Sequence, residues 1–315
     1  MGEPIALPAG VRLVHIGPHK TGTTALQRAM HRSREALHEQ GVHYAYPTVQ
    51  AYKPAIGLTG LRGRRGGPVA GPEDWNVLVE EVRAAGEMRV VVSSESFANA
   101  DTEHIEQLRD DLGADRVHVV RMVRRYDKLV PSQWQQQLLN GRRISLDGFC
   151  TRLLDPDSSF WLRHGFATLT RRWAEVVGPD NLTVVVVDED DPRWLLHVFE
   201  RMLSLRDGTL PLPPGRPNRS LSLAEAETLR KVNVAIAKAG WSDRVIHHYV
   251  REGVSAGFKR IPSDARAGRP RLSRDLHERL AAATSRDVDD LLALGVHVVG
   301  DVGRLAVPPW QGDDG

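Results

Sequence analysis

Five consecutive residues near the start of the chain, Lys20-Thr21-Gly22-Thr23-Thr24, combine the groups that bind an anion. Gly22 lets the backbone approach a ligand closely, Lys20 adds a point charge, and the threonines supply backbone N–H groups and hydroxyls. An apolar stretch precedes the segment and a helical pattern follows it, which places these groups at a helix N-terminus, where the helix dipole favours negative charge. The alternative is an ordinary turn between a strand and a helix, with threonines that face solvent.

The spacing of this loop differs from the phosphate-binding loop of nucleotide triphosphatases. That loop has the pattern G-x-x-x-x-G-K-[ST], in which the lysine follows the last glycine. Here Thr23 follows Gly22, and the lysine lies two positions before the glycine. The cation is therefore on the opposite side of the turn, which argues against a nucleoside triphosphate as the ligand.

A second pair of polar residues follows a later apolar stretch. The run Val117–Val123 leads into Arg124, and Ser132 comes eight positions after Arg124 on the following helix. A guanidinium can bind a phosphate through two parallel hydrogen bonds, and a hydroxyl adds a further donor. For this spacing alone, the alternative is a helix start with an exposed arginine and a serine that faces solvent.

The loop and the Arg124–Ser132 pair, in this order, resemble the two nucleotide motifs of the PAPS-dependent sulfotransferase family, in its bacterial sulfotransferase-like branch. PAPS is 3′-phosphoadenosine 5′-phosphosulfate. The segment 173–185 also resembles the family's central strand and the residues before it, so the resemblance covers roughly residues 11–204. The sequence departs from the family at Ala25, where many members have a tryptophan that stacks on adenine.

The resemblance implies a role for each matching residue. Lys20 would contact the bridging oxygen of the leaving phosphate. The 5′-phosphate would be held by the rest of the loop, Thr21, Gly22, Thr23 and Thr24. The 3′-phosphate would be bound by Arg124 and Ser132, which is a site that a triphosphate nucleotide does not need.

A carboxylate after another apolar run is the candidate general base. The run Met88–Ser93 leads to Glu95, which places this side chain at the same edge of a parallel sheet as Lys20. Sulfuryl transfer uses a base to take the acceptor proton, and the base is histidine in some branches of the family and glutamate in others. We assign Lys20 and Glu95 as the catalytic residues. The alternative for Glu95 is an N-cap or a surface carboxylate.

Histidines near these motifs are weaker candidates for the base. His19, next to Lys20 in the loop, is the rival of Glu95, and its alternative is a supporting or solvent-facing group. His15 and His43 are expected to be strand residues.

Basic residues elsewhere give two further candidates. The family closes its nucleotide pocket with a C-terminal basic loop that contains glycine, and by this resemblance Arg260 and Arg269 are assigned as further 3′-phosphate contacts. The cluster Arg62–Arg65 could bind an anionic acceptor or act as a lid, with a merely solvated loop as the alternative.

The segments around these residues alternate between strands and helices. Strands are expected at 11–16, 42–46, 88–93, 117–123 and 182–187. Helices are expected at 23–40, 75–85, 104–112, 128–139, 194–203, 222–239, 241–254 and 273–294. A further helix is expected to end near residues 173–177. Residues 47–72, rich in Gly, Pro and Arg, are expected to form a long surface loop.

This alternation predicts an α/β fold of the three-layer, P-loop-like type. A central, mostly parallel sheet of four or five strands is flanked by helices and followed by a helical C-terminal part, with ligand sites at the C-terminal strand ends. We expect a single domain over residues 1–315, with the α/β core at 11–204, a mainly helical part at 205–304 and a tail at 305–315.

Composition narrows the classes of partner. The net charge of +2 gives no reason to expect nucleic acid, and Cys150, the only cysteine, excludes an intramolecular disulfide and a zinc finger. The sequence shows neither a signal-peptide pattern nor the roughly 18 apolar residues of a membrane span. We expect a cytoplasmic protein without stable membrane insertion. No metal-ligand spacing is evident, and Lys20 and backbone N–H groups can neutralise a leaving phosphate, so no metal is required.

Together these features predict a sulfotransferase that moves a sulfuryl group from PAPS to an acceptor hydroxyl or amine by in-line displacement. The acceptor is a small molecule, a glycan or a lipid, and neither its identity nor the oligomeric state follows from the sequence. One alternative is a small-molecule kinase or other nucleotide-binding enzyme of the same fold. Another is a sulfotransferase-like binding protein without catalysis.

Overall fold

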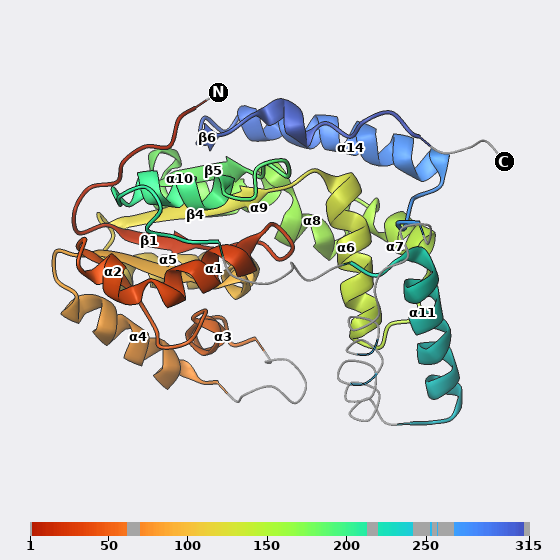
Figure 1. Cartoon of the computed structure of the whole chain (residues 1–315), viewed down its shortest axis with the longest axis horizontal. Helices are drawn as coiled ribbons and strands as arrows, with labels where there is room; N and C mark the ends of the chain where they lie inside the picture. The colour runs from red at the N-terminus through yellow and green to blue at the C-terminus, as the bar shows by residue number, and fades with distance from the viewer. Residues whose placement is uncertain are drawn as a thin grey trace. The chain divides into compact units, whose positions relative to one another are not determined.

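The computed structural model describes residues 2–61, 70–212, 220–241, 253, 257 and 268–311. The chain divides into two compact units, whose elements are labelled in Figure 1. The first unit consists of Met1–Arg124, Ser159–Pro213 and Ser285–Ala306, and the second of Arg125–Ser158, Pro214–Thr284 and Val307–Gly315. The expectation of a single domain stays a prediction.

The first unit is built on a six-stranded sheet in the order β2-β3-β1-β4-β5-β6, and every pair of neighbouring strands is parallel. The strands are β1 (Arg12–His15), β2 (Val42–Tyr44), β3 (Arg89–Ser93), β4 (Val117–Val123), β5 (Leu182–Val186) and β6 (His297–Val299). The predicted α/β fold is confirmed, and five of these strands lie where they were predicted. The expectation of four or five strands was wrong, because β6 has only three residues and shows no recognisable period.

Strand β1 lies between β3 and β4, and its last residue, His15, pairs with Ser93 and Val120. The chain leaves β1 at the point where the strand order reverses, which is where ligands bind in open α/β sheets. Because all strands are parallel, the loops after β1, β3, β4 and β5 emerge at the same edge. This edge carries most of the predicted site residues.

Helices cover both faces of the sheet. The helices of the first unit are α1 (Thr23–Arg32), α2 (Arg34–His38), α3 (Tyr52–Thr59), α4 (Pro72–Ala84), α5 (Thr102–Leu112), α8 (Ser159–His164), α9 (Phe166–Val177) and α10 (Trp194–Met202). Buried side chains of α1, α2 and α10 share one core with alternate strand residues such as Leu13, Val120 and Met122. Helix α9 packs against β4 and β5, and α5 packs against α9.

Helix α3 corrects the prediction of a structureless loop at 47–72. Its side chains Ala55, Ile56 and Leu58 are buried. Pro54 lies in the first turn, where a missing N–H removes no helical hydrogen bond. A Cβ at Gly57 would lie 2.1 Å from the carbonyl oxygen of Gly71, so glycine serves close packing here and does not mark a turn.

The second unit is helical over its described residues. It contains α6 (Tyr126–Leu139), α7 (Leu146–Leu153) and α11 (Leu223–Lys238), and α14 (Arg274–Leu292) begins within it. Ser222 and Glu225 form a capping box at the start of α11. Asn233 of α11 donates to the carbonyl oxygens of Leu138 and Arg142, at 2.8 Å each. This buried amide joins α11 to the end of α6.

Short 3₁₀ helices complete the described elements: η1 (Glu95–Asn99), η2 (Pro179–Asn181) and η4 (Val302–Leu305). Within the described part of the chain, no helix has the length and apolar composition that a membrane span requires. The predicted helix at 241–254 lies almost entirely outside the described residues.

Candidate active site

The predicted anion-binding segment Lys20–Thr24, called the anion loop below, lies where the chain passes from β1 to α1 in the first unit. Gly22 is the N-cap of α1 and has a left-handed backbone conformation, with φ 86°. Lys20 also has a positive φ, 74°, which is uncommon for a residue with a side chain. The first N–H groups of an α-helix have no carbonyl four positions earlier in the helix and point toward its N-terminus, and here the N–H of Ala25 donates to the carbonyl oxygen of Gly22 at 3.2 Å. The loop thus has the backbone geometry of an anion site.

The three threonines of the loop differ in their surroundings. Thr21 and Thr23 are buried, whereas Thr24 is exposed. The Thr21 hydroxyl donates to the carbonyl oxygen of Pro18, with an oxygen–oxygen distance of 2.7 Å, and the Thr23 hydroxyl donates to Oε1 of Glu95. Two of the three hydroxyl protons therefore hold the loop and its neighbour in place, and Thr24 is the one at the surface.

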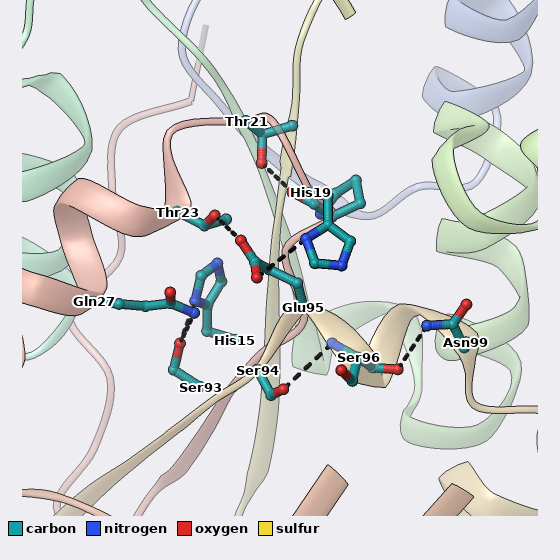
Figure 2. Close-up of polar contacts among 11 residues, drawn as sticks. His15, His19, Thr21, Thr23, Gln27, Ser93, Ser94, Glu95, Ser96 and Asn99 are labelled. Carbon is teal, nitrogen blue, oxygen red and sulfur yellow. Dashed lines mark hydrogen bonds and ion pairs between the residues drawn. The ribbon is translucent and has the colours of Figure 1, made fainter. Parts of the chain in front are cut away.

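Glu95 lies directly beside the loop, as Figure 2 shows. It begins η1, whose N-cap is Ser94, and the residue is only 6% exposed. Its Oε2 lies 3.2 Å from Nδ1 of His19, while Oε1 accepts from Thr23. The alternative of an N-cap or surface carboxylate was wrong, because Glu95 is a buried side chain with partners on the predicted anion loop.

Glu95 is ionised at neutral pH. Burial raises the pKa of Glu95, but the hydrogen bond and charge of protonated His19, the Thr23 hydroxyl and the charge that His15 carries when protonated lower it by more, so the resulting pKa is about 2. The site thus contains an ionised carboxylate in contact with a loop that has the backbone geometry of an anion site.

His15 is the last residue of β1 and interacts electrostatically with Glu95, and burial lowers the pKa of His15 to about 4. Its Nδ1 is 2.7 Å from Oγ of Ser93, which also accepts from Nε2 of Gln27 at 3.1 Å. His15 is therefore a neutral support within the core. His43 is in β2, and its Nε2 lies 2.8 Å from Glu81, so both histidines are strand residues as predicted.

Gly17 is a site residue that the sequence analysis missed. It has φ 81°, and a Cβ here would lie 3.0 to 3.2 Å from Cγ, Cβ and Cα of Glu95. Only glycine combines this conformation with such a close approach. A glycine directly after the first strand was the available signal.

Arg124 joins the end of β4 to the anion loop. Its Nη1 donates to the carbonyl oxygen of Lys20 at 3.0 Å, and its Nε donates to Oε1 of Glu189 at 2.5 Å. The two partners of the ion pair are 27% and 33% exposed. Glu189 was also missed, although the acidic run Asp188–Asp191 after β5 could have drawn attention to it.

The remaining predicted site residues belong to the second unit or lie outside the described residues. Ser132 is half-buried in α6, and Arg269 is exposed; both belong to the second unit. Arg260 and the Arg62–Arg65 cluster lie outside the described residues. The roles assigned to these residues stay predictions.

Among the residues that the structure describes, no group of three or more His, Cys, Asp or Glu side chains is placed to hold a metal ion. The ionisable groups at the loop and its described contacts include Lys20, His19 and Glu95, together with Arg124 and its partner Glu189. They suit proton transfer and anion binding.

Comparisons with known proteins give little beyond the fold. No protein-family model matches the chain, and no curated protein matches it. Among solved structures, the chain is similar to the crystal structure of a sulfotransferase from Alicyclobacillus acidocaldarius, with a TM-score of 0.48 and 16% sequence identity over 92% of this chain and 96% of that chain. Similarity at this level assigns no role to any residue, so a function for this chain must be argued from its own site.

Proposed function

We propose that this chain is a sulfotransferase that moves a sulfuryl group from PAPS to an acceptor hydroxyl or amine. The observation that supports this most directly is the hydrogen bond from Arg124 to the carbonyl oxygen of Lys20, which brings the end of β4 onto the anion loop. Two cationic residues then lie together at a helix N-terminus. This arrangement suits a ligand with two separate phosphate groups.

The residues of the loop fit the phosphosulfate end of PAPS. Lys20 and the first N–H groups of α1 can hold the 5′-phosphate and stabilise the charge that develops on it as the leaving group. PAPS, when bound, supplies the sulfuryl group and this leaving group. None of these contacts requires a metal ion, and metal-independent binding is part of the proposal.

Arg124 fits the 3′-phosphate end, with one rearrangement. Its guanidinium is bonded to Glu189, and a phosphate presents the same kind of anionic oxygen acceptors as that carboxylate. Binding would exchange the carboxylate for the phosphate on the same donor. Ser132, Arg260 and Arg269 remain candidates for further contacts, and the adenine-stacking residue is still to be identified because Ala25 has no ring.

The acceptor proton is taken by the pair His19 and Glu95, whose carboxylate also contacts the Thr23 hydroxyl of the loop. Both are groups that can act as general bases. The carboxylate and the imidazole contact each other at 3.2 Å, so the two act together.

A thermal-shift comparison tests the proposal. Adenosine 3′,5′-bisphosphate without metal should raise the melting temperature more than ATP with Mg²⁺ does, because only the bisphosphate matches both sites. At 100 times its dissociation constant, a ligand stabilises the folded state by about 2.7 kcal/mol.

The control variant is Lys20→Asn, because asparagine tolerates the left-handed conformation of residue 20 and carries no charge. This variant should lose most of the shift. A larger shift with ATP and Mg²⁺ would instead identify a kinase-like enzyme. Binding of the bisphosphate by a wild-type protein that never releases it from PAPS would identify a binding protein without catalysis.

A further inference from the structure

The two members of the His19–Glu95 pair differ sharply in their access to solvent. The His19 side chain is 52% exposed, and the Glu95 side chain is 8% exposed. An acceptor molecule arriving from solution meets the imidazole before it can reach the carboxylate.

Both oxygens of Glu95 already accept from protein donors. Oε1 accepts from the Thr23 hydroxyl, and Oε2 faces Nδ1 of His19. The pKa of this carboxyl, about 2 despite its burial, makes it a weak base at neutral pH. Glu95 is thus well suited to hold a neighbour in position and poorly suited to take a proton from an alcohol or amine.

His19 presents its second ring nitrogen away from the carboxylate. Figure 2 shows the imidazole with Nδ1 toward Glu95 and the other nitrogen on the far side of the ring. When Nδ1–H donates to the carboxylate, Nε2 carries the lone pair that can accept a proton. A carboxylate that fixes the tautomer of an imidazole in this way is a general device of base catalysis.

The titratable groups around His19 come from three further elements. Glu95 is in η1, His15 is in β1 and His164 is in α8. The pKa of His15 is about 4 and that of His164 is about 3, both lowered chiefly by burial, so these two rings are neutral above pH 5. Lys20 follows His19 directly. Within the described residues, Glu95 is therefore a negative charge that faces the ring.

We infer that His19 is the general base for the acceptor and that Glu95 is the positioning residue that fixes its tautomer. The inference rests on the proposed sulfuryl transfer. Nε2 of His19 takes the proton of the acceptor O–H or N–H as the acceptor lone pair forms the new bond to sulfur. The bond between sulfur and the bridging oxygen breaks, and its electron pair stays on the phosphate of adenosine 3′,5′-bisphosphate, next to Lys20. The proton then leaves His19 for solvent.

The first experiment compares variants with two probe acceptors, phenol and p-nitrophenol, by the rate of bisphosphate release from PAPS. His19→Gln should lower kcat with phenol by about 10²- to 10³-fold, the usual contribution of a positioned base. With p-nitrophenol, which is far more acidic than phenol and about half ionised near neutral pH, the loss should be much smaller. Glu95→Gln should cost about tenfold with phenol, and the double variant should be no slower than His19→Gln.

Two controls separate catalysis from folding. His43→Gln removes another histidine that contacts a glutamate, at 2.8 Å, and should leave kcat unchanged. The thermal shift with adenosine 3′,5′-bisphosphate should persist in every variant of His19 and Glu95. Free imidazole in the buffer should partly restore turnover in His19→Ala, because the exposed position leaves room for it.

The second experiment does not depend on activity. Nitrogen-15 NMR of histidine-labelled protein, at a pH where the ring is neutral, should find His19 with its proton on Nδ1, and Glu95→Gln should weaken this preference. A proton on Nε2 in the wild type overturns the inference. So does a His19→Gln variant with wild-type kcat on phenol while Lys20→Asn is inactive. If the wild type shows no response to the bisphosphate, the proposed function itself is wrong, and the NMR result shows whether the pair still has the inferred tautomer.

Discussion

Glu95 and Glu189 both follow a strand of the parallel sheet within three residues, yet they lie in opposite environments. Glu95 follows β3, is almost fully buried and contacts a hydroxyl and an imidazole. Glu189 follows β5, is one-third exposed and contacts the guanidinium of Arg124. The first is enclosed by its partners, whereas the second pairs with a cation in a partly exposed position, where we propose that a ligand competes for the same cation.

This difference suggests that Glu95 and Glu189, which lie on two sides of the anion loop, have different roles. A buried carboxylate with engaged oxygens keeps its geometry through a reaction cycle, because any movement would leave an unpaired charge in the core. A half-exposed ion pair exchanges easily, since solvent screening makes it worth little. The Glu95 side is therefore a fixed support, and the Glu189 side is an exchangeable contact.

The largest expected difference between the two glutamates is in how much each contributes to the free energy of unfolding at low pH. The pKa of Glu95 is about 2 in the folded state against an ordinary value of 4.5. A depressed carboxyl pKa contributes stability above the unfolded value, and that stability is lost as pH falls through the folded value. A difference of this size corresponds to about 3 kcal/mol. Between pH 5 and pH 2, wild type should therefore lose about this much more free energy of unfolding than Glu95→Gln.

Urea unfolding at a series of pH values measures this difference. Glu189→Gln is the matched control, and its free energy of unfolding should follow that of the wild type within about 1 kcal/mol at every pH, as for other exposed ion pairs. Parallel pH profiles for wild type and Glu95→Gln would show that Glu95 is not the stabilised carboxylate described above.

The next largest effect is expected at Gly17, which acts through Glu95. Gly17→Ala imposes a left-handed alanine and a Cβ at 3.0 to 3.2 Å from three atoms of Glu95. We expect a loss of about 2 to 3 kcal/mol in the free energy of unfolding, together with lower turnover, since both strain and displacement of Glu95 contribute.

Gly41→Ala is the control that measures the backbone strain of a left-handed alanine without any displacement of Glu95. Gly41 has φ 75°, and a Cβ there meets nothing within 4 Å. This variant should lose only about 1 kcal/mol and keep full turnover. Equal losses of stability at the two glycines would mean that the contact with Glu95 has no energetic role.

The smallest expected effect is at Glu189 and concerns the affinity for the nucleotide. Glu189→Gln removes the charge that competes for Arg124, so it should bind adenosine 3′,5′-bisphosphate about 3- to 10-fold more tightly, in line with the modest worth of an exposed ion pair. Isothermal titration calorimetry at fixed salt measures this. Asp190→Asn is the control, because Asp190 pairs with Arg304 at 2.7 Å. Weaker binding in Glu189→Gln would show that this glutamate supports the ligand and does not compete with it.

The sequence located the strand ends well, and with them Lys20, Glu95 and Arg124, because buried β-branched runs are visible in any window of the chain. It did not predict which of the loop's side chains turn toward Glu95. Thr23 and His19 meet Glu95 across 72 and 76 positions, and the loop conformation that directs them depends on positive φ angles at Lys20 and Gly22. The sequence therefore assigns Glu95 as the general base and offers His19 only as its rival.

Helix α3 and the role of Glu189 were not predicted, because each depends on local geometry that the sequence does not reveal. Pro54 and Gly57 resemble turn residues, and only their positions in the first turn and at the close contact with Gly71 show why α3 forms. Within the acidic run after β5, spacing cannot tell which carboxylate reaches Arg124, because that depends on how the chain bends after the strand.

Strand β6 gives the sheet an order of assembly during translation. It pairs with β5, which ends at Val186, but its own residues begin only at His297. On the ribosome, five strands are therefore available long before the sixth, and β5 has an unpaired edge for as long as residues 187–296 are being synthesised. Such an edge can accept a strand from another nascent chain. The speed of translation through this interval thus sets how long each new molecule is open to misassembly, and slow codons there would lengthen that exposure.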